Sequence, residues 1–416
     1  MKKFFFTAAL AATALGFTAC SNDDVESQQG MTGEQVLSID GTENVYTIAN
    51  AENANWQIVD CPAWVTPIKM AGSASEAIEV YVESNQRQNL RKGDIVVEYG
   101  NGQTRATRAE QTNKLPETFI KRSYAAGWSF DARTYADYRG LRQQIFNPVR
   151  LEQDNADNYS IDDQSYEDIQ YFYGTNESHL QRNINAKLNV NGKFNAFKLD
   201  LNGNFGKNSL SSEDRVFSWM RTIYIEEIAF MSYTEGGEAD ETTYFTEEFR
   251  SMRKMVIDEN GSDAAIKYLI EAYGTHYVHQ AALGGSMNYY YSTVNKNKVD
   301  SLGINGVVKA GYGEKFKVNG DANYLDQYKE MNDETIEKVE VKGGDAMMLV
   351  RCIESGTMHA DSLKVWTNTL KSGQVELISF ELTSIAALFP EDISLKITKY
   401  LDKLYYQEMP LTRSEE

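Results

Sequence analysis

The sequence predicts a chain of the α+β class, in which a small β-sandwich precedes a larger domain that combines a sheet with helices. Three observations lead to this prediction. Residues 34–112 hold short segments that alternate apolar and polar side chains, without a helical period. Residues 113–416 hold both strand-like alternation and apolar residues at helical spacing. The 416 residues are enough for two or three domains.

The charge of the chain limits its partners. There are 41 basic against 60 acidic residues, a formal net charge of −19. Nucleic acid requires a basic footprint, so we expect no nucleic-acid partner. The same charge opposes simple electrostatic attraction to an anionic bilayer. If this protein acts on a membrane, we therefore expect a specific receptor to bring it there.

The first twenty residues predict a signal peptide. Lys2 and Lys3 precede an apolar run that is too short for a comfortable membrane span. The small residues before Cys20 resemble the lipobox of bacterial lipoproteins, although Phe17 occupies a position that is more often Leu. The resemblance implies that Cys20 is lipidated and begins the mature chain. The alternative is ordinary signal-peptidase cleavage, which would leave Cys20 incidental.

Residues 21–33 predict a flexible, polar tether. The tether begins with SNDD, which looks like the acidic tag that directs some Gram-negative lipoproteins to the outer cell surface. No later run approaches the ~18 consecutive apolar residues of a membrane helix. We therefore expect an exported protein that is lipid-anchored at the outer membrane, on the cell surface or released from it.

Residues 34–112 contain five strand-like segments: VLSI, VYTIA, WQIV, AIEVYVES and GDIVVEY. Gly, Asn and Asp separate them, and this spacing is typical of a β-sandwich. The segment resembles the BACON domain, an immunoglobulin-like module of bacterial surface proteins, at Trp56, Trp64, Asn85, Arg91, Gly93 and Gln111. The two tryptophans either stack on glycans or form the core of a spacer. The general burial of aromatic residues favours the core.

The most specific pattern is YGTHYVHQAALGG, in which an aromatic-Gly-Thr-His-aromatic run is followed by six residues and a Gly-Gly pair. It matches the signature of the membrane attack complex/perforin (MACPF) family at Tyr273, Gly274, Thr275, His276, Tyr277, Gly284 and Gly285. Before it, Ala265, Tyr268, Leu269 and Ala272 predict a helix that ends at Gly274. After it, SMNYYYSTV is strand-like. Further along the chain, three features resemble later landmarks of the family: Lys342–Asp345, Trp366 and Leu370.

The resemblance implies that residues 113–416 form a MACPF domain, a bent central antiparallel sheet flanked by helical clusters. In that family two clusters unfold into transmembrane hairpins, and a ring of subunits closes a barrel. Closure matters because an open sheet edge in lipid leaves backbone groups without hydrogen bonds. The resemblance also implies that Gly284, Gly285, Gly343 and Gly344 serve bending of the sheet and assembly. Glycine tolerates backbone angles that other residues do not, and a simple tight turn at Gly284–Gly285 is compatible with this role.

Two segments, residues 184–205 and 302–320, show the alternation of a membrane β-strand. Amphipathic strands of an ordinary sheet would look the same, but the signature lies between the two segments, in the order the family requires. The apolar face is thin in the second segment. The membrane-hairpin candidates are Leu188, Val190, Phe197, Leu199, Leu201, Ile304, Val308 and Tyr312.

Enzyme motifs are missing from the sequence. No Walker loop, HExxH, GxSxG or CxxC is present, and no pair of carboxylates stands out as a glycosidase pair. His276 and His279 lack a third metal ligand nearby, and Cys61 and Cys352 are far apart. We therefore expect no enzyme, no catalytic residues, no cofactor, no metal site and no structural disulfide.

The sequence as a whole favours a pore-forming surface or secreted effector. We expect it to act against competing bacteria, to recognise an outer-membrane protein or a lipopolysaccharide glycan, and to form a ring with copies of itself. The alternative is a non-lytic adhesion or glycan-binding lipoprotein that retains the MACPF fold, because a fold does not fix a function.

Overall fold

The structure is a computed structural model. It describes residues 35–85, 90–113, 125–154, 157–163, 165–188, 190, 197–212, 214–232, 241–294, 301–319, 321–330 and 335–408. The chain divides into two compact units, residues 1–119 and 120–416. The predicted signal peptide, Cys20 and the tether lie outside the described residues.

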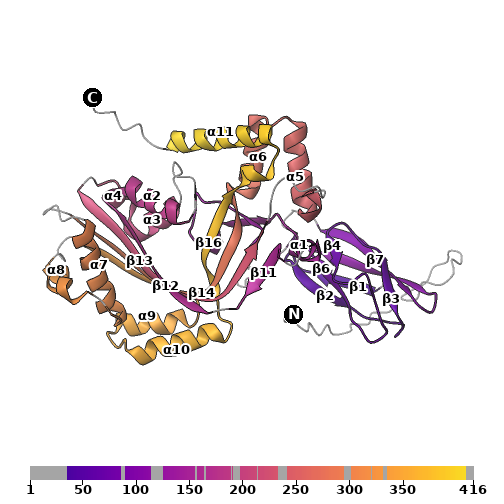
Figure 1. Cartoon of the computed structure of the whole chain (residues 1–416), viewed down its shortest axis with the longest axis horizontal. Helices are drawn as coiled ribbons and strands as arrows, with labels where there is room; N and C mark the ends of the chain where they lie inside the picture. The colour runs from indigo at the N-terminus through magenta and orange to yellow at the C-terminus, as the bar shows by residue number, and fades with distance from the viewer. Residues whose placement is uncertain are drawn as a thin grey trace, which may run out of the picture. The chain divides into compact units, whose positions relative to one another are not determined.

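The first unit consists of two sheets around one core (Figure 1). One sheet has the order β1-β8-β7-β3-β5 and the other β2-β6-β4. All five predicted segments form strands. The prediction missed the short strands β4 and β5, and it missed β8 because its Thr, Arg and Ala residues lack large apolar side chains. The strands are β1 (Gln35–Ile39), β2 (Asn44–Ile48), β3 (Trp56–Asp60), β4 (Val65–Pro67), β5 (Ala71–Gly72), β6 (Ile78–Val82), β7 (Arg91–Tyr99) and β8 (Thr104–Gln111).

Both tryptophans of this unit belong to its core. Trp56 is 3% and Trp64 5% exposed, so neither offers a face on which a sugar could stack. The Arg91 guanidinium lies 4.5 Å from the centre of the Trp64 ring, and its Nε donates to Gln111 Oε1 at 2.7 Å. Gln111 Nε2 in turn donates to the Glu83 carbonyl at 3.0 Å. The positions that carry the BACON resemblance thus include a buried polar network that joins strands across the unit.

The second unit is built on an antiparallel sheet whose centre is two long strands, β13 (Arg215–Met231) and β14 (His276–Val294). On the side of β13 away from β14, both β12 (Tyr166–Gly174) and β11 (Tyr159–Asp162) pair directly with β13, at successive stretches along it. On the other side of β14, two strands pair with different stretches of it. β16 (Glu376–Ser384) pairs with its first half, and β15 (Ile336–Lys342) pairs with its second half. The short strands β9 (Trp128–Phe130) and β10 (Leu141–Gln144) extend the sheet where β14 begins. This mixture of sheet and helices confirms the predicted α+β class.

Helices cover both faces of this sheet, which therefore has two cores (Figure 1). Tyr290 of β14 points into the larger core, whereas Tyr289 and Tyr291 point into the other, as strand alternation requires. The larger core includes α2 (Glu177–Lys187), α3 (Lys198–Phe205) and α4 (Lys207–Leu210), and also α1 (Pro148–Asp154), α5 (Glu247–Asp258), α6 (Asp263–Tyr273) and α11 (Glu391–Glu408). The second core includes α7 (Ser301–Phe316), α8 (Leu325–Glu330), α9 (Ala346–Glu354) and α10 (Ala360–Lys371).

The predicted helix before the signature is α6. Ser262 caps it by accepting a hydrogen bond from the Ala265 amide, and Gly274, with φ of +74°, ends it. Ala265 and Leu269 are buried, whereas Tyr268 is 59% exposed. In the described part of the chain, no helix is both long enough and apolar enough to cross a membrane.

Candidate functional site

Two connections between neighbouring strands are far longer than a turn requires. Strands β12 and β13 pair up to Gly174 and Phe217, and β14 and β15 up to Ser292 and Ile336. Antiparallel neighbours are normally joined by about 2–5 residues. Here the described residues between 175 and 214 include α2–α4, and those of the second connection include α7, η4 (Ala322–Tyr324) and α8. Because Phe217 also pairs with Ser292, both connections leave the same end of the sheet.

The predicted membrane-hairpin residues lie in these connections and belong to helical packing, not to strands. Residues 184–205 and 302–320 thus hold helices in this structure, which is the resting arrangement that the family resemblance implies for the two segments. Leu199 is in α3, and its side chain is not among those that the structure describes. The other predicted residues are all at most 5% exposed: Leu188, Val190, Phe197, Leu201, Ile304, Val308 and Tyr312.

A spacing of four residues explains how one sequence produces both patterns. In α7 the buried residues Ile304, Val308, Tyr312 and Phe316 recur at every fourth position, which places them on one helical face. A period of four is also a multiple of two, so the same residues would share one face of an extended strand. Phe197, Leu201 and Phe205 repeat this spacing in the first connection. One apolar set therefore fits either conformation.

The start of α3 is strained. Phe197 has φ of +57°, a left-handed conformation that costs a non-glycine residue about 1–2 kcal/mol. Its amide donates to the Ala132 carbonyl at 2.8 Å, and its ring is 1% exposed. Packing and this hydrogen bond thus hold Phe197 in a strained backbone conformation. The strain would disappear if the segment became extended.

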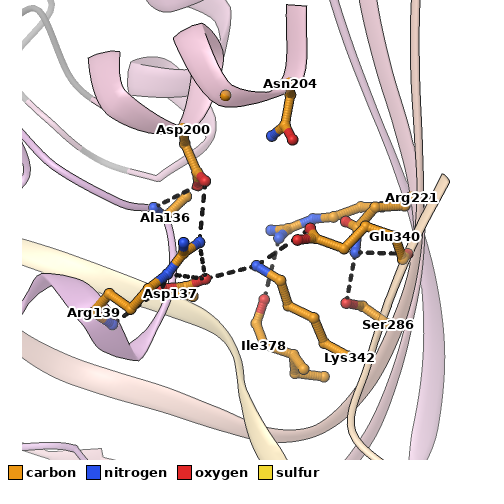
Figure 2. Close-up of polar contacts among 12 residues, drawn as sticks. Ala136, Asp137, Arg139, Asp200, Asn204, Arg221, Ser286, Glu340, Lys342 and Ile378 are labelled. Carbon is orange, nitrogen blue, oxygen red and sulfur yellow. Dashed lines mark hydrogen bonds and ion pairs between the residues drawn. The ribbon is translucent and has the colours of Figure 1, made fainter. Parts of the chain in front are cut away.

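A cluster of charged side chains around the buried Asp137 fastens α3 over the sheet (Figure 2). Asp200 of α3 accepts from the Ala136 amide at 2.9 Å and pairs with Arg139 at 3.2 Å. Arg139 is in the 3-10 helix η2 (Tyr138–Gly140) and also binds Asp137, which forms a 2.7 Å ion pair with Lys342 of β15. Burial raises the pKa of Asp200, whereas Arg139 and Lys342 outweigh burial and hold the pKa of Asp137 below its ordinary value.

A fully buried arginine crosses the same face of the sheet. Arg221 of β13 donates from Nε to Gln170 Oε1 of β12 at 2.8 Å and from Nη1 to the Ile378 carbonyl of β16 at 3.1 Å. Its guanidinium lies 4.8 Å from the centre of the Trp219 ring. Burial lowers the pKa of Arg221 to about 10. These contacts tie three strands together beneath α3.

The glycine pair of the signature marks the point where β14 changes its outer neighbour. β16 pairs with β14 up to Gly284, and β15 pairs with it from Ser286 onward. A Cβ on Gly284 would lie 1.9 Å from the Tyr224 carbonyl oxygen, so only glycine fits there. The register of β13 shifts between Ile225 and Glu227, directly across from this point.

The second glycine pair lies against the first. Gly343 and Gly344 end β15 with φ of +72° and +58°, and a Cβ on Gly343 would lie 2.3 Å from the Gly284 carbonyl oxygen. Trp366 of α10 donates from Nε1 to the Gly343 carbonyl at 2.9 Å. A Cβ on Gly285 would meet Trp366 and Leu370, each at 2.7 Å. We call this contact of four glycines with α10 the glycine junction.

The remaining signature residues fasten the start of β14. Thr275 Oγ1 accepts from the Ala132 amide at 3.2 Å and lies 2.8 Å from His276 Nδ1. Burial lowers the pKa of His276 to about 4, so its ring is neutral at neutral pH. Tyr273 and Tyr277 are buried in the larger core.

His279 has a different environment from that of His276. Its ring nitrogens lie 3.0 Å from Thr383 Oγ1 and 3.2 Å from Glu381 Oε2, both on β16. Among the described residues, no group of three or more His, Cys, Asp and Glu side chains could hold a metal ion.

Sequence reasoning located the two connections, the glycines and Lys342 beside them, but it predicted none of the contacts among the charged residues. Asp137, Asp200, Arg221 and Lys342 come from four separate segments and share no motif. A lone Asp or Lys within an alternating segment gives no signal of its distant partner. One signal in the sequence could have helped: the alternation of β15 places Lys342 on the face of the sheet that carries α3.

Comparison with known families and structures places the second unit among characterised folds. A family model described as MAC/Perforin domain matches residues 152–414. The crystal structure of GNIP1Aa from Chromobacterium piscinae is 15% identical, with a TM-score of 0.55 over 69% of this chain and 56% of that one. A MAC/Perforin-domain protein of Bacteroides thetaiotaomicron is 13% identical, with a TM-score of 0.50 over 71% and 61% of the two chains. This chain thus spans less than two thirds of either protein. A comparison with curated proteins gave no match.

Proposed function

Because this chain belongs to the MAC/Perforin family, as its signature predicted, we propose that it is a pore-forming surface or secreted effector that acts on the membranes of competing bacteria. One observation carries the proposal. Two helical connections leave the same end of the sheet, and their apolar residues are spaced to fit both a packed helix and a membrane strand. The strained Phe197 and the buried charge of Asp200 add to the case that α3 is held in a state it can leave.

In the proposed mechanism each connection unfolds and extends the strands that flank it. Strands β12 and β13 then continue as one hairpin, and β14 and β15 as a second. A membrane strand needs about 9–11 residues, and each connection is long enough for two such strands and a turn. Copies of the chain join edge to edge into a ring, because closure gives every backbone group a hydrogen-bonding partner in lipid.

Delivery and targeting are further parts of the proposal. Residues 1–20 act as the lipoprotein signal, Cys20 carries the lipid, and the first unit serves as an immunoglobulin-like spacer of the BACON type at the outer membrane. The buried Trp56 and Trp64 support a spacer over a glycan-binding module. With a net charge of −19, recognition relies on a receptor, an outer-membrane protein or a lipopolysaccharide glycan. The chain acts without catalysis and without a cofactor.

A reversible crosslink between α3 and the sheet tests the mechanism. Lys338 Nζ of β15 lies 2.6 Å from Asn204 Oδ1 of α3, so cysteines at these positions can be joined by a short, reducible bis-maleimide. We expect the crosslinked N204C/K338C protein to bind target cells without releasing an entrapped dye, and reduction of the linker to restore release. The matched control is the same pair of cysteines left uncrosslinked.

The assay uses a panel of Gram-negative bacteria loaded with dye, with bound protein measured in parallel. Dye release by the fully crosslinked protein would contradict release of α3. Binding without permeabilisation of any strain by the unmodified protein would instead favour the alternative, a non-lytic adhesion or glycan-binding lipoprotein.

A further inference from the structure

Strand β15 is an edge strand that contacts both helical connections. In the described part of the chain its hydrogen-bonded partner strand is β14 alone, from Ser286–Lys342 to Ser292–Ile336. Its side chains alternate between the two faces of the sheet. Lys338 and Lys342 lie on the face that carries α3, and Glu337, Val339 and Val341 lie on the face that carries α7 and α8.

On the α3 face, β15 holds the end of the first helical connection. Lys338 Nζ donates to Asn204 Oδ1 at 2.6 Å and to the Gly203 carbonyl at 3.4 Å. Asn204 is 7% exposed, so the acceptor side of this charge-assisted hydrogen bond is buried while the lysine is half-buried. Lys342 of the same strand pairs with Asp137, which belongs to the charged cluster that includes Asp200. Two lysines of one strand therefore help to fix α3.

On the opposite face, the neighbouring residue Glu337 holds the second connection. Its carboxylate pairs with Lys315 of α7 at 2.8 Å and accepts from the Tyr289 hydroxyl of β14 at 2.7 Å. Tyr328 of α8 is a third hydrogen-bonding partner of this carboxylate. The Glu337 side chain is 17% exposed. One carboxylate thus joins both helices of the second connection to β15.

We propose that β15 couples the release of the two helical connections, with Glu337 and Lys338 as adjacent positioning residues on its opposite faces. Consecutive Cα atoms are about 3.8 Å apart, so a shift of the strand that breaks the contacts of Glu337 also displaces Lys338. An edge strand held by one neighbour is the part of the sheet that moves most easily. The inference rests on the proposed function for its purpose, because a pore needs both hairpins from each subunit.

Amide hydrogen exchange of the full-length protein in solution tests the coupling without any membrane. Glu337→Gln removes the ion pair with α7, and Lys338→Met removes the tie to α3. We expect each variant to speed exchange about threefold to tenfold in both residues 198–205 and residues 301–316. The matched control is Tyr312→Phe, which removes the 2.6 Å hydrogen bond from Tyr312 of α7 to Thr222 Oγ1 of β13 and leaves β15 untouched. It should speed exchange in residues 301–316 alone.

Three outcomes would overturn the proposal. The effect of Glu337→Gln could stay within residues 301–316, Tyr312→Phe could loosen α3 as well, or neither β15 variant could change exchange in the opposite connection. A protein that shows the coupling but never permeabilises a cell would refute the proposed function and leave this inference standing. A protein that permeabilises cells but shows no coupled exchange would refute this inference and leave the proposed function standing.

Discussion

The backbone of Gly284 passes so close to Tyr224 that a Cβ on Gly284 would lie 1.9 Å from the Tyr224 carbonyl oxygen. Backbone atoms block the space, so no side-chain rotation can relieve the contact. The glycine pair of the signature is therefore a condition for the resting fold itself, in addition to any role it has when the sheet moves.

Gly284→Ala should destabilise the monomer by about 2–4 kcal/mol, because two central strands must separate to admit the methyl group. Urea unfolding measures the change. The control is Gly203→Ala in α3, where a Cβ would meet no atom within 4 Å. That variant should be neutral or more stable by up to about 1 kcal/mol, since alanine favours helices. Equal stability of Gly284→Ala and the natural protein would show that the strands are not tightly apposed here.

Local signals in the sequence predicted some parts of the fold well. The prediction that the helix before the signature ends at Gly274 is confirmed, because capping chemistry is local. The signature located the long strand β14 and the glycine pair where β14 changes its neighbouring strand, although the four glycines could not be known to meet. Gly343 lies far from Gly284 in sequence, and only the pairing of β15 with β14 brings the two together.

The alternating segments show why sequence reasoning stopped where it did. Ile304, Val308 and Tyr312 satisfy a period of two and a helical repeat equally well, so pattern alone cannot choose between strand and helix. Tertiary packing against Tyr289 and Tyr291 decides for the helix in the resting state. The charged contacts of Asp200 and Glu337 depend on that packing, so no local sequence pattern could predict them.

Trp366 fastens α10 to the glycine junction by a hydrogen bond as well as by packing. Trp366→Phe keeps most of the buried ring but leaves the Gly343 carbonyl without its donor, so we expect a loss of about 1–3 kcal/mol. Trp366→Ala should cost about 3–5 kcal/mol. Urea unfolding compares them with Val365→Ala, a neighbour that is 54% exposed and should change stability by less than about 0.5 kcal/mol. If Trp366→Phe matched that control, the hydrogen bond would contribute nothing.

His276 should make the fold sensitive to mild acid. Its pKa is about 4 in the fold against 6.5 when exposed, so between these pH values the unfolded chain binds the proton and the folded chain does not. The free energy of unfolding should therefore fall as pH drops through this window, by up to about 1.4 kcal/mol per pH unit from this group. We expect the difference in unfolding free energy between the natural protein and His276→Gln to shrink from pH 7.5 to pH 5. A difference that stays constant over that range would mean that His276 is not buried in its neutral form.

Two neighbouring valines of α7 distinguish its resting role from its proposed role in the membrane. Val307 and Val308 are both fully buried in the same core. Substitution of either by threonine should destabilise the resting monomer similarly, by about 1–2 kcal/mol, since each places a hydroxyl in an apolar site. In an extended strand, however, Val308 shares a face with Ile304 and Tyr312, and Val307 points to the opposite face.

Val308→Thr should therefore reduce dye release per bound molecule several-fold more than Val307→Thr does, because only Val308 meets lipid in the proposed hairpin. Urea unfolding of both variants confirms that their stabilities match before the release assay is compared. An equal loss from the two variants would tie the effect to α7 packing alone. A greater loss from Val307→Thr would place the opposite set of residues against the lipid, and the four-residue spacing would then have no function beyond the helix.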